Sequence, residues 1–282
     1  MSNVAFLGTG LLGSGMVEAM RRRGEAVTVW NRTERKARAL EPLGVSVAAS
    51  AADAVAGADR IHMTLPDDSI VDRLIEECAP RMRRDAVIVD HSTTSPRGTK
   101  ARVERMQRSG IAFLHAPVFM SPQAARDASG LMMVSGPRAV FERVAGDLEK
   151  MTADLWYVGE RPDLAAIYKL FGNSMLFVIT AGLADVFAMA KANGVPPSDA
   201  VAVFGRFKVA AVIGYRGEKM ARGDFAATFE MTMARKDMRL MLDAADGQPL
   251  TVLPSIAARM DEAIAKGLGS DDMGAIAAEV VR

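Results

Sequence analysis

Residues 4–33 constrain the fold of this chain more than any other segment. The apolar run Val4–Leu7 leads into the pattern Gly8-x-Gly10-x-x-Gly13, and a second apolar run, Ala26–Trp30, follows a helix-like stretch. This order of strand, turn, helix and strand is typical of a dinucleotide-binding unit. Gly8 allows the tight turn, Gly10 lets the pyrophosphate approach bare backbone, and Gly13 lets the helix pack against the strand. The turn residues that we expect to contact the cofactor are Gly8, Thr9, Gly10, Leu11, Leu12 and Gly13.

The residues after the second apolar run indicate which dinucleotide binds. NAD-binding proteins usually carry Asp or Glu here, which accepts hydrogen bonds from the ribose 2′-hydroxyl and would repel a 2′-phosphate. This chain has the neutral Asn31, followed by Arg32 and Thr33. A guanidinium and a hydroxyl can both donate to a phosphate, so we expect NADP. A helix N-cap at Thr33 followed by a solvated basic face is the alternative, but it does not account for the missing carboxylate.

Composition excludes several other classes of protein. The 282 residues suffice for two domains, and 50% hydrophobic with 24% charged residues is ordinary for a soluble globular protein. With 35 Lys and Arg against 34 Asp and Glu, the formal charge of +1 gives no basic field for nucleic acid or an anionic membrane. The single cysteine, Cys78, excludes an internal disulfide and fits a buried structural thiol. The three histidines are too scattered for metal-ligand spacing, so we expect no metal site.

Two further features bear on where the protein resides. The first apolar run begins almost at Met1, which leaves no room for a signal or transit peptide. The longest apolar stretch, Met175–Ala190, is interrupted by Asp185 and is short for a membrane span. We therefore expect a cytoplasmic protein that does not enter a membrane.

The first half of the chain alternates between β-type runs and helix-period segments. This alternation predicts an α/β Rossmann-type doubly wound sheet, with ligands at the carboxyl ends of its strands. The later runs leave room for an antiparallel strand or two at the edge. After the opening unit, we expect strands at 61–65, 86–90, 112–117, 131–135 and 155–158, and helices near 33–41, 69–78, 96–109 and 137–149.

From Asp163 onward the β-type pattern stops. Residues 163–193 predict one long helix that is apolar around most of its circumference, so we expect it to be buried on most sides between two domains. The chain is thus predicted to form an NADP-binding Rossmann domain over residues 1–161 and an all-helical C-terminal domain over 162–282. Further helices are expected near 198–206, 208–222, 230–246, 251–266 and 272–281.

Lys169 and Asn173 are the main candidates for chemistry in the second half. They lie four residues apart on the predicted long helix, and therefore on one face. A lysine on a largely buried helix is costly unless it is paired or used. Its ammonium can stabilise and then protonate the alkoxide that forms when hydride reduces a carbonyl, while Asn173 can hold a substrate oxygen. A lysine that reaches solvent at a domain edge is the alternative.

These motifs occur together, and in this order, in a known family. Over essentially its full length the chain resembles the β-hydroxyacid dehydrogenases, the group of 3-hydroxyisobutyrate dehydrogenase, in the superfamily of the 6-phosphogluconate dehydrogenase NAD-binding domain. GTGLLGSGM resembles the family's GxGxMGxxM, with Leu12 in place of the methionine, and Lys169 and Asn173 fall on its GxxxKxxxN. The resemblance implies that Lys169 is the catalytic acid/base and that the protein is a homodimer or homotetramer.

The same resemblance implies three further cofactor contacts. Leu65 and Pro66, in MTLPDD, match a loop that passes near the cofactor. DHSTTSP resembles the family's DxSTxxP, whose threonine, here Thr93, contacts the nicotinamide side. RKDM resembles the family's KDL, which implies that Lys236 closes over the cofactor.

The chain departs from the family at the substrate motif. The family sequence DAPVSGG corresponds here to HAPVFMS, so His115 replaces the aspartate, and Phe119 and Met120 replace serine and glycine. Bulky apolar side chains would desolvate a carboxylate without supplying donors. Either the substrate lacks that carboxylate and is larger or more apolar, or an anion is held elsewhere, or the loop has drifted with function unchanged. Ala165 also replaces the first glycine of GxxxK.

The leading hypothesis is an NADP-dependent oxidoreductase that reduces a small aldehyde or ketone and oxidises the alcohol in reverse. Lys169 would donate the proton, and Phe119, Met120 and Ser121 would shape the substrate site together with Asn173. Imine reductases share this architecture and form a second hypothesis, which Lys169 argues against and the apolar Phe119-Met120 pair favours. A non-catalytic NADP-binding module is the third.

Overall fold

The computed structural model describes residues 3–281. By internal contacts the chain forms two compact units, Met1–Asn173 and Ser174–Arg282. Mixed α/β structure gives way to helices between β9 (Asp154–Gly159) and α8 (Leu164–Ala192), where the sequence places the boundary at residues 161 and 162. The division by contacts falls later, inside α8, because the first turns of this helix belong to the N-terminal unit.

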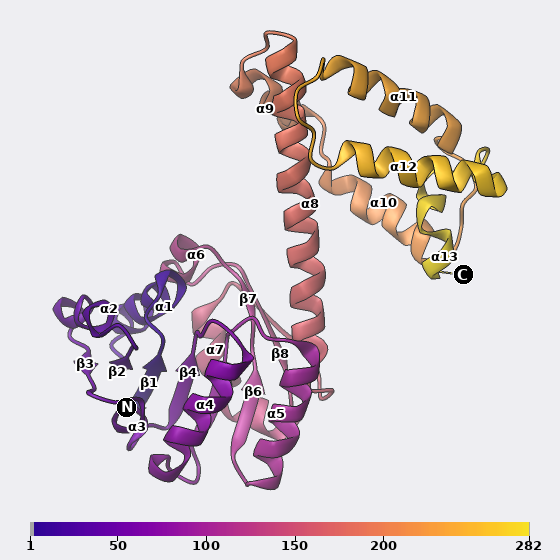
Figure 1. Cartoon of the computed structure of the whole chain (residues 1–282). Helices are drawn as coiled ribbons and strands as arrows, with labels where there is room; N and C mark the ends of the chain where they lie inside the picture. The colour runs from indigo at the N-terminus through magenta and orange to yellow at the C-terminus, as the bar shows by residue number, and fades with distance from the viewer. Residues whose placement is uncertain (1–2, 282) are drawn as a thin grey trace. The chain divides into compact units, whose positions relative to one another are not determined.

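The N-terminal unit is built on one sheet, to which nine strands contribute within residues 3–281 (Figure 1). Six strands run parallel in the order β3-β2-β1-β4-β5-β6, the doubly wound order. At the far edge β8 is antiparallel to β6 and β7 and parallel to β9. The other strands are β1 (Asn3–Leu7), β2 (Ala26–Trp30), β3 (Ser46–Val47), β4 (Arg60–Met63), β5 (Val87–Asp90), β6 (Ala112–His115), β7 (Val118–Phe119) and β8 (Leu131–Ser135).

Helices cover both faces of this sheet. One core cluster joins the sheet to α1, α6 and α7, and another joins it to α3, α4 and α5. The central strands β4 and β5 are consequently buried along their whole length, which explains why their sequences are nearly continuous apolar runs. The helices are α1 (Leu11–Arg22), α2 (Glu34–Arg38), α3 (Ala51–Val55), α4 (Asp68–Cys78), α5 (Pro96–Arg108), α6 (Pro122–Arg126) and α7 (Arg138–Leu148).

The Rossmann-type fold class is confirmed, with four short elements that the sequence pattern did not predict. These are β3, α3, β7 and α6, each of two or five residues, which is too short to give a clear hydrophobic period. The predicted helix at 33–41 is divided between α2 and a 3₁₀ turn, Glu41–Leu43. Cys78, at the end of α4, is fully buried as expected, and burial raises the pKa of its thiol to about 12.

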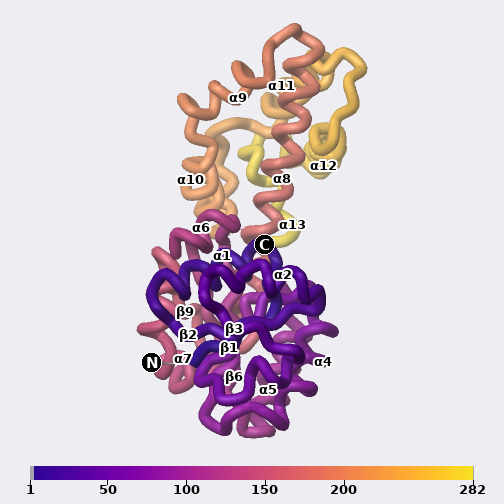
Figure 2. Tube along the Cα trace, turned by 90° about the vertical axis from the view of Figure 1, so that its left-hand side faces the viewer, coloured from indigo at the N-terminus to yellow at the C-terminus, as the bar shows by residue number. Residues whose placement is uncertain are grey.

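The C-terminal unit is helical, as predicted (Figure 2). Asp185 of α8 accepts hydrogen bonds from the backbone N–H groups of Thr251, Val252 and Leu253, and so caps the first turn of α12. The predicted helix at 272–281 is instead a 3₁₀ turn, Met273–Ala277, followed by the short α13. The helices after α8 are α9 (Pro197–Arg206), α10 (Ala210–Ala221), α11 (Met231–Ala244), α12 (Leu253–Ala263) and α13 (Ala278–Val281).

The expectation that the long helix is buried on most sides is wrong for the single chain. Phe171 and Phe177 of α8 are 62% and 71% exposed, and the stretch Ser174–Thr180 is exposed throughout. A helix that is apolar all round requires cover on its free sides, which this chain does not supply from residues 3–281. By length and composition alone α8 could also cross a membrane, with a mean hydropathy of 1.7, although one such helix is weak evidence. The absence of a membrane segment therefore stays a prediction.

Candidate cofactor and active site

A groove of about 490 Å³ lies at the carboxyl ends of the parallel strands, next to β1. It belongs wholly to the N-terminal unit. Eleven of the predicted cofactor residues line it: Gly8, Gly10, Leu11, Leu12, Gly13, Asn31, Arg32, Thr33, Leu65, Pro66 and Thr93.

The glycine turn has the form that a pyrophosphate requires. Gly8 has φ of 97°, and a Cβ there would lie 2.3 Å from the Thr64 carbonyl oxygen. A Cβ at Gly13 would lie 2.1 Å from the Gly8 oxygen, so the helix packs as closely as the motif predicts. A Cβ at Gly10 would meet no atom within 4 Å, so this glycine borders open space in the groove. Because α1 begins at Leu11, the unpaired N–H groups of its first turn lie next to this opening. The turn therefore fits a bound dinucleotide.

Asn31 lines the groove and also makes two hydrogen bonds to the backbone of the protein. Its side-chain oxygen accepts from the backbone N–H of Thr9 at 3.1 Å, and its amide nitrogen donates to the Thr33 carbonyl at 2.9 Å. Asn31 thus ties the glycine turn to the end of β2. Thr9 itself is buried behind the turn, and its side chain does not border the groove.

The end of the groove beyond β2 is positively charged, because Arg32 and Lys36 line it. Arg73 of α4 also lines the groove, and none of the three makes an ion pair within residues 3–281. The lining contains no Asp or Glu side chain among the described residues. Thr33 is the N-cap residue of α2, as the alternative interpretation expects, but its hydroxyl makes no cap hydrogen bond to that helix. This end of the groove can therefore attract a phosphate.

The opposite wall of the groove carries the two loops that follow β4 and β5. The backbone N–H of Leu65 donates to the Ser92 hydroxyl at 2.8 Å, and the N–H of Ser92 donates to Asp90 at 3.0 Å. These bonds connect the loop of Leu65 to Ser92, the residue before Thr93, and both Leu65 and Thr93 line the groove. The sequence did not predict the other groove residues of these two loops and of α4, which are Thr64, Ile70, Arg73, Leu74, His91 and Ser92. Of these, His91 and Ser92 lie inside the motif DHSTTSP.

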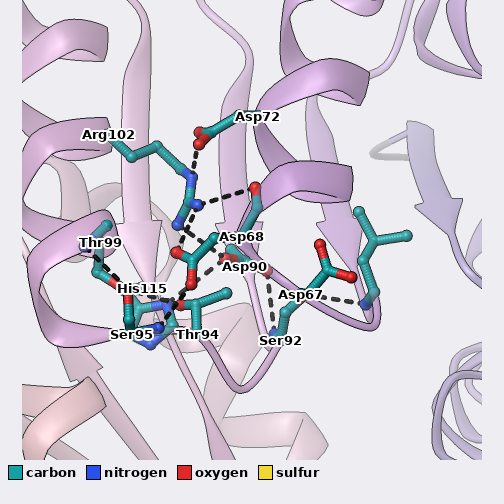
Figure 3. A network of polar contacts seen from close by, with 12 residues as sticks. Asp67, Asp68, Asp72, Asp90, Ser92, Thr94, Ser95, Thr99, Arg102 and His115 are labelled. Carbon is teal, nitrogen blue, oxygen red and sulfur yellow. Dashed lines mark hydrogen bonds and ion pairs between the residues drawn. The ribbon is translucent and has the colours of Figure 1, made fainter.

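A buried polar network supports this wall from beneath (Figure 3). The fully buried Arg102 of α5 donates to Asp68 at 2.9 Å and to Asp72 at 2.7 Å, which binds α5 to α4. His115 lies 3.5 Å from Asp90, and both side chains are fully buried. Burial alone would raise the pKa of the Asp90 carboxyl, but the neighbouring His115 and Ser92 lower it. His115 is therefore part of the support of the loop and is not exposed to a substrate.

A pair of buried histidines connects β4 with the loop after β5. His62 Nδ1 lies 2.9 Å from His91 Nε2, and His91 Nδ1 lies 2.7 Å from the Ala116 carbonyl oxygen. Burial lowers the pKa of His91 to about 4, and burial together with His91 lowers the pKa of His62 well below its usual value. Both rings are thus neutral at pH 7, and the bond to Ala116 requires the proton of His91 on Nδ1.

Lys169 lies in the first turns of α8 and is held by the segment that follows Ala116. Its Nζ donates to the Val118 carbonyl at 2.8 Å and lies 3.9 Å from the centre of the Phe119 ring. Burial lowers the pKa of the Lys169 ammonium. The Phe119 ring in turn packs on Gly172, where a Cβ would lie only 2.2 Å from it. Since His91 binds Ala116, the lysine and the groove wall are joined through three consecutive residues of this segment.

The remaining predicted residues fall in different places. Asn173 lies one turn after Lys169 on α8 and is partly buried. Met120 packs against the core beneath α1, and the Ser121 hydroxyl caps α6 by accepting from the Ala124 N–H at 3.0 Å. Lys236 is in α11 of the C-terminal unit, 2.7 Å from Asp237, and its contact with the cofactor stays a prediction.

Two protein families match this chain. The family described as the NAD-binding domain of 6-phosphogluconate dehydrogenase matches residues 3–159. The family described as 'NAD-binding of NADP-dependent 3-hydroxyisobutyrate dehydrogenase' matches residues 165–280. With the groove and the strand order already described, these matches define a dinucleotide-dependent oxidoreductase.

Individual relatives agree with this class. The chain is 28% identical to glyoxylate/succinic semialdehyde reductase 2 of Arabidopsis thaliana, over 97% of this chain and 78% of that protein. It is 27% identical to 3-sulfolactaldehyde reductase of Escherichia coli, over 99% of this chain and 96% of that protein. The solved imine reductase of Myxococcus stipitatus with NADP⁺ has the same fold, with a TM-score of 0.90 at 20% identity over 97% and 98% of the two chains. The chain belongs to the β-hydroxyacid dehydrogenase family, and NADP is the cofactor that the family description carries.

Proposed function

We propose that this protein is an NADP-dependent reductase of a small aldehyde or ketone, which also oxidises the corresponding alcohol, with Lys169 as the general acid and base. The observation that carries the proposal is the position of the Lys169 ammonium. It is half-buried, 2.8 Å from the Val118 carbonyl, on a segment bound to the wall of the cofactor groove.

The chemistry assigns one step to this lysine. NADPH, when bound, supplies a hydride to the carbonyl carbon, and negative charge develops on the carbonyl oxygen. The Lys169 ammonium stabilises that oxygen and donates a proton to it from Nζ, which gives the alcohol. Burial lowers the pKa of the ammonium and so makes the transfer easier. Asn173 would hold the substrate oxygen, and Lys236 would close over the cofactor.

The choice of NADP rather than NAD rests on charge. Arg32, Lys36 and Arg73 line the groove without ion-pair partners among the described residues, and no carboxylate lines it. A 2′-phosphate would find cations in this groove, whereas the 2′-hydroxyl of NAD would find no acceptor of the usual kind.

The apolar cover of Lys169 bears on the substrate. Phe119 places an aromatic face 3.9 Å from the ammonium, where the family motif has small residues and a serine. This arrangement supports a substrate without a carboxylate at that position. It also favours a second candidate function, imine reduction, because an aromatic face can stabilise a cationic iminium as it stabilises the ammonium.

The decisive experiment follows NADPH consumption with a panel of aldehydes, ketones and cyclic imines. We expect Lys169→Ala to lower kcat for carbonyl substrates by about 100-fold or more, with the dissociation constant of NADPH unchanged. Lys191→Ala, which removes an exposed lysine from the other end of α8, is the matched control. Equal turnover by wild type and Lys169→Ala would remove this lysine from the mechanism. Turnover of imines alone would favour the second candidate, and NADPH binding without turnover would indicate a non-catalytic module.

We also propose that the active form is a homodimer. The exposed apolar face of α8 supports this assembly, and so do α9 and α10, in which no described residue is buried.

A further inference from the structure

We infer that Arg73, in α4, is a second guanidinium that binds the 2′-phosphate of NADP, in addition to Arg32. The inference rests on the proposed function, because it assigns a further residue to the same cofactor. Arg73 lines the groove together with Arg32 and Thr33, although it lies about forty residues further along the chain and outside the motifs that indicate NADP.

Two acidic residues of its own helix are engaged by α5. Asp68 and Asp72 point toward α5, where Arg102 binds both (Figure 3). Arg105 of α5 also binds Asp72, at 2.6 Å. These ion pairs commit one face of α4 to the neighbouring helix. Arg73 lies on another face, is exposed, and makes no ion pair within residues 3–281.

The carboxylate just before the helix is also engaged elsewhere, and Glu76 and Glu77 of α4 make no ion pair with Arg73 within residues 3–281. Asp67 is the N-cap of α4 and accepts hydrogen bonds from the Ile70 N–H at 3.0 Å and from the Ser69 hydroxyl at 2.6 Å. Its pKa is lowered mainly by the Ser69 hydroxyl, with the charge of Arg73 as a minor cause. The positive charge of Arg73 is therefore not cancelled locally.

The residues on either side of Arg73 explain why it faces the groove. Ile70 and Leu74 line the groove as well, one turn apart, and Leu74 is anchored in the core beneath the sheet. This apolar pair suits an adenine ring, and a guanidinium between them would be close to the ribose that carries the phosphate. Arg73 thus has a fixed backbone, a free charge and a position in the groove, which are the requirements for a phosphate ligand.

The test measures binding of the cofactor's adenosine end, without turnover. Dissociation constants are determined by calorimetry for 2′,5′-ADP and for 5′-AMP, with wild type, Arg73→Ala, Arg73→Lys and Arg73→Glu. Arg84→Ala removes an exposed arginine outside the groove that also has no ion pair among the described residues, and it is the control. Arg32→Ala serves as the reference for a residue of the predicted motif.

We expect Arg73→Ala to weaken 2′,5′-ADP about tenfold or more and 5′-AMP less than threefold, Arg73→Glu to weaken 2′,5′-ADP further, and Arg73→Lys to restore part of the loss. Equal losses for both ligands would mean that Arg73 contacts only the adenine, and no loss would mean that it contacts neither; either result overturns the assignment. If wild type bound neither 2′,5′-ADP nor NADPH, the proposed function would fall as well. If wild type bound NADPH and the substitutions of Arg73 left that binding unchanged, this inference alone would be overturned.

Discussion

Phe119 shows how one side chain can determine the environment of another. Its ring lies between Gly172 and the ammonium of Lys169, so the backbone of α8 and the charge of the lysine both depend on where the ring sits. The aromatic face stabilises the charged form of the lysine, whereas burial favours the neutral form and is the cause that lowers its pKa. Because residue 172 is a glycine, the Phe119 ring can lie against α8 and close to the ammonium, and this position determines how strongly the ring opposes the effect of burial.

Gly172→Ala tests this arrangement. The added methyl group would displace the Phe119 ring, and we expect kcat/KM for a carbonyl substrate to fall about tenfold through misplacement of Lys169. The added methyl group should also cost about 1–3 kcal/mol of stability through overpacking. Steady-state kinetics and urea unfolding measure the two effects.

The matched control is Gly146→Ala in α7, where a Cβ would meet no atom within 4 Å. This variant should retain its activity and gain roughly 0.5–1 kcal/mol, because alanine favours a helix over glycine. Unchanged kinetics in Gly172→Ala would mean that the ring position has no influence on the lysine.

At the scale of elements, the loops after the parallel strands are held together by buried polar side chains. The pair His62 and His91 joins β4 to the loop after β5 and, through the Ala116 carbonyl, to the segment that contains β7. With both rings neutral, His91 Nδ1 donates to the Ala116 carbonyl and His91 Nε2 accepts from His62 Nδ1, and burial opposes protonation of either ring. The cofactor wall is therefore supported by two histidines that burial keeps neutral at pH 7.

The lowered pKa of the buried His91 predicts that the stability of the protein falls in acid. The pKa of His91 is about 4 in the folded protein and about 6.5 when unfolded, so the unfolded state binds more protons between these values and stability falls as the pH falls. From His91 alone we expect a loss of roughly 2 kcal/mol between pH 7 and pH 5. Urea unfolding at several pH values measures the loss, and His91→Asn should flatten the slope. A wild-type stability that stays constant from pH 7 to pH 5 would contradict this account.

The elements also show what the sequence could predict. The β1–α1–β2 unit was predictable because each glycine of its turn meets a separate steric requirement. The close approaches at Gly8 and Gly13 confirm this for two of them. The contact between His62 and His91 was not predictable, because it joins residues 29 positions apart and depends on strand register. Arg73 was missed for a similar reason, since an exposed arginine on a helix carries no local signal of a groove beside it.

At the scale of the whole molecule, the two units each have a core of their own, but the chain leaves apolar helices uncovered. The C-terminal core is formed by residues of α11 and α12, with Phe225 before them and Ala275 and Ala278 after them. By contrast, α9 and α10 have no buried residue in the described chain, and α8 exposes large side chains along the stretch Ser174–Thr180. An apolar pattern predicts that a surface is covered, but it does not say whether the same chain covers it.

Phe177→Glu tests the proposed dimer. This residue is 71% exposed, and we expect a glutamate there to convert the dimer to a monomer in light scattering coupled to gel filtration, because burying the charge would be costly. Val280→Glu, at an apolar residue that is 82% exposed on α13, should leave the assembly intact. A wild-type protein that is monomeric at micromolar concentration would refute the dimer.

The buried thiol of Cys78 can report on the opening of the helix that contains it. It ends α4, the helix that carries Arg73, and with a pKa of about 12 it reacts with disulfide reagents only when that helix opens. As the chain has no other cysteine, the labelling rate reads the opening of this one helix without any engineered probe. A nucleotide held against α4 should slow that labelling, even before any substrate has been found.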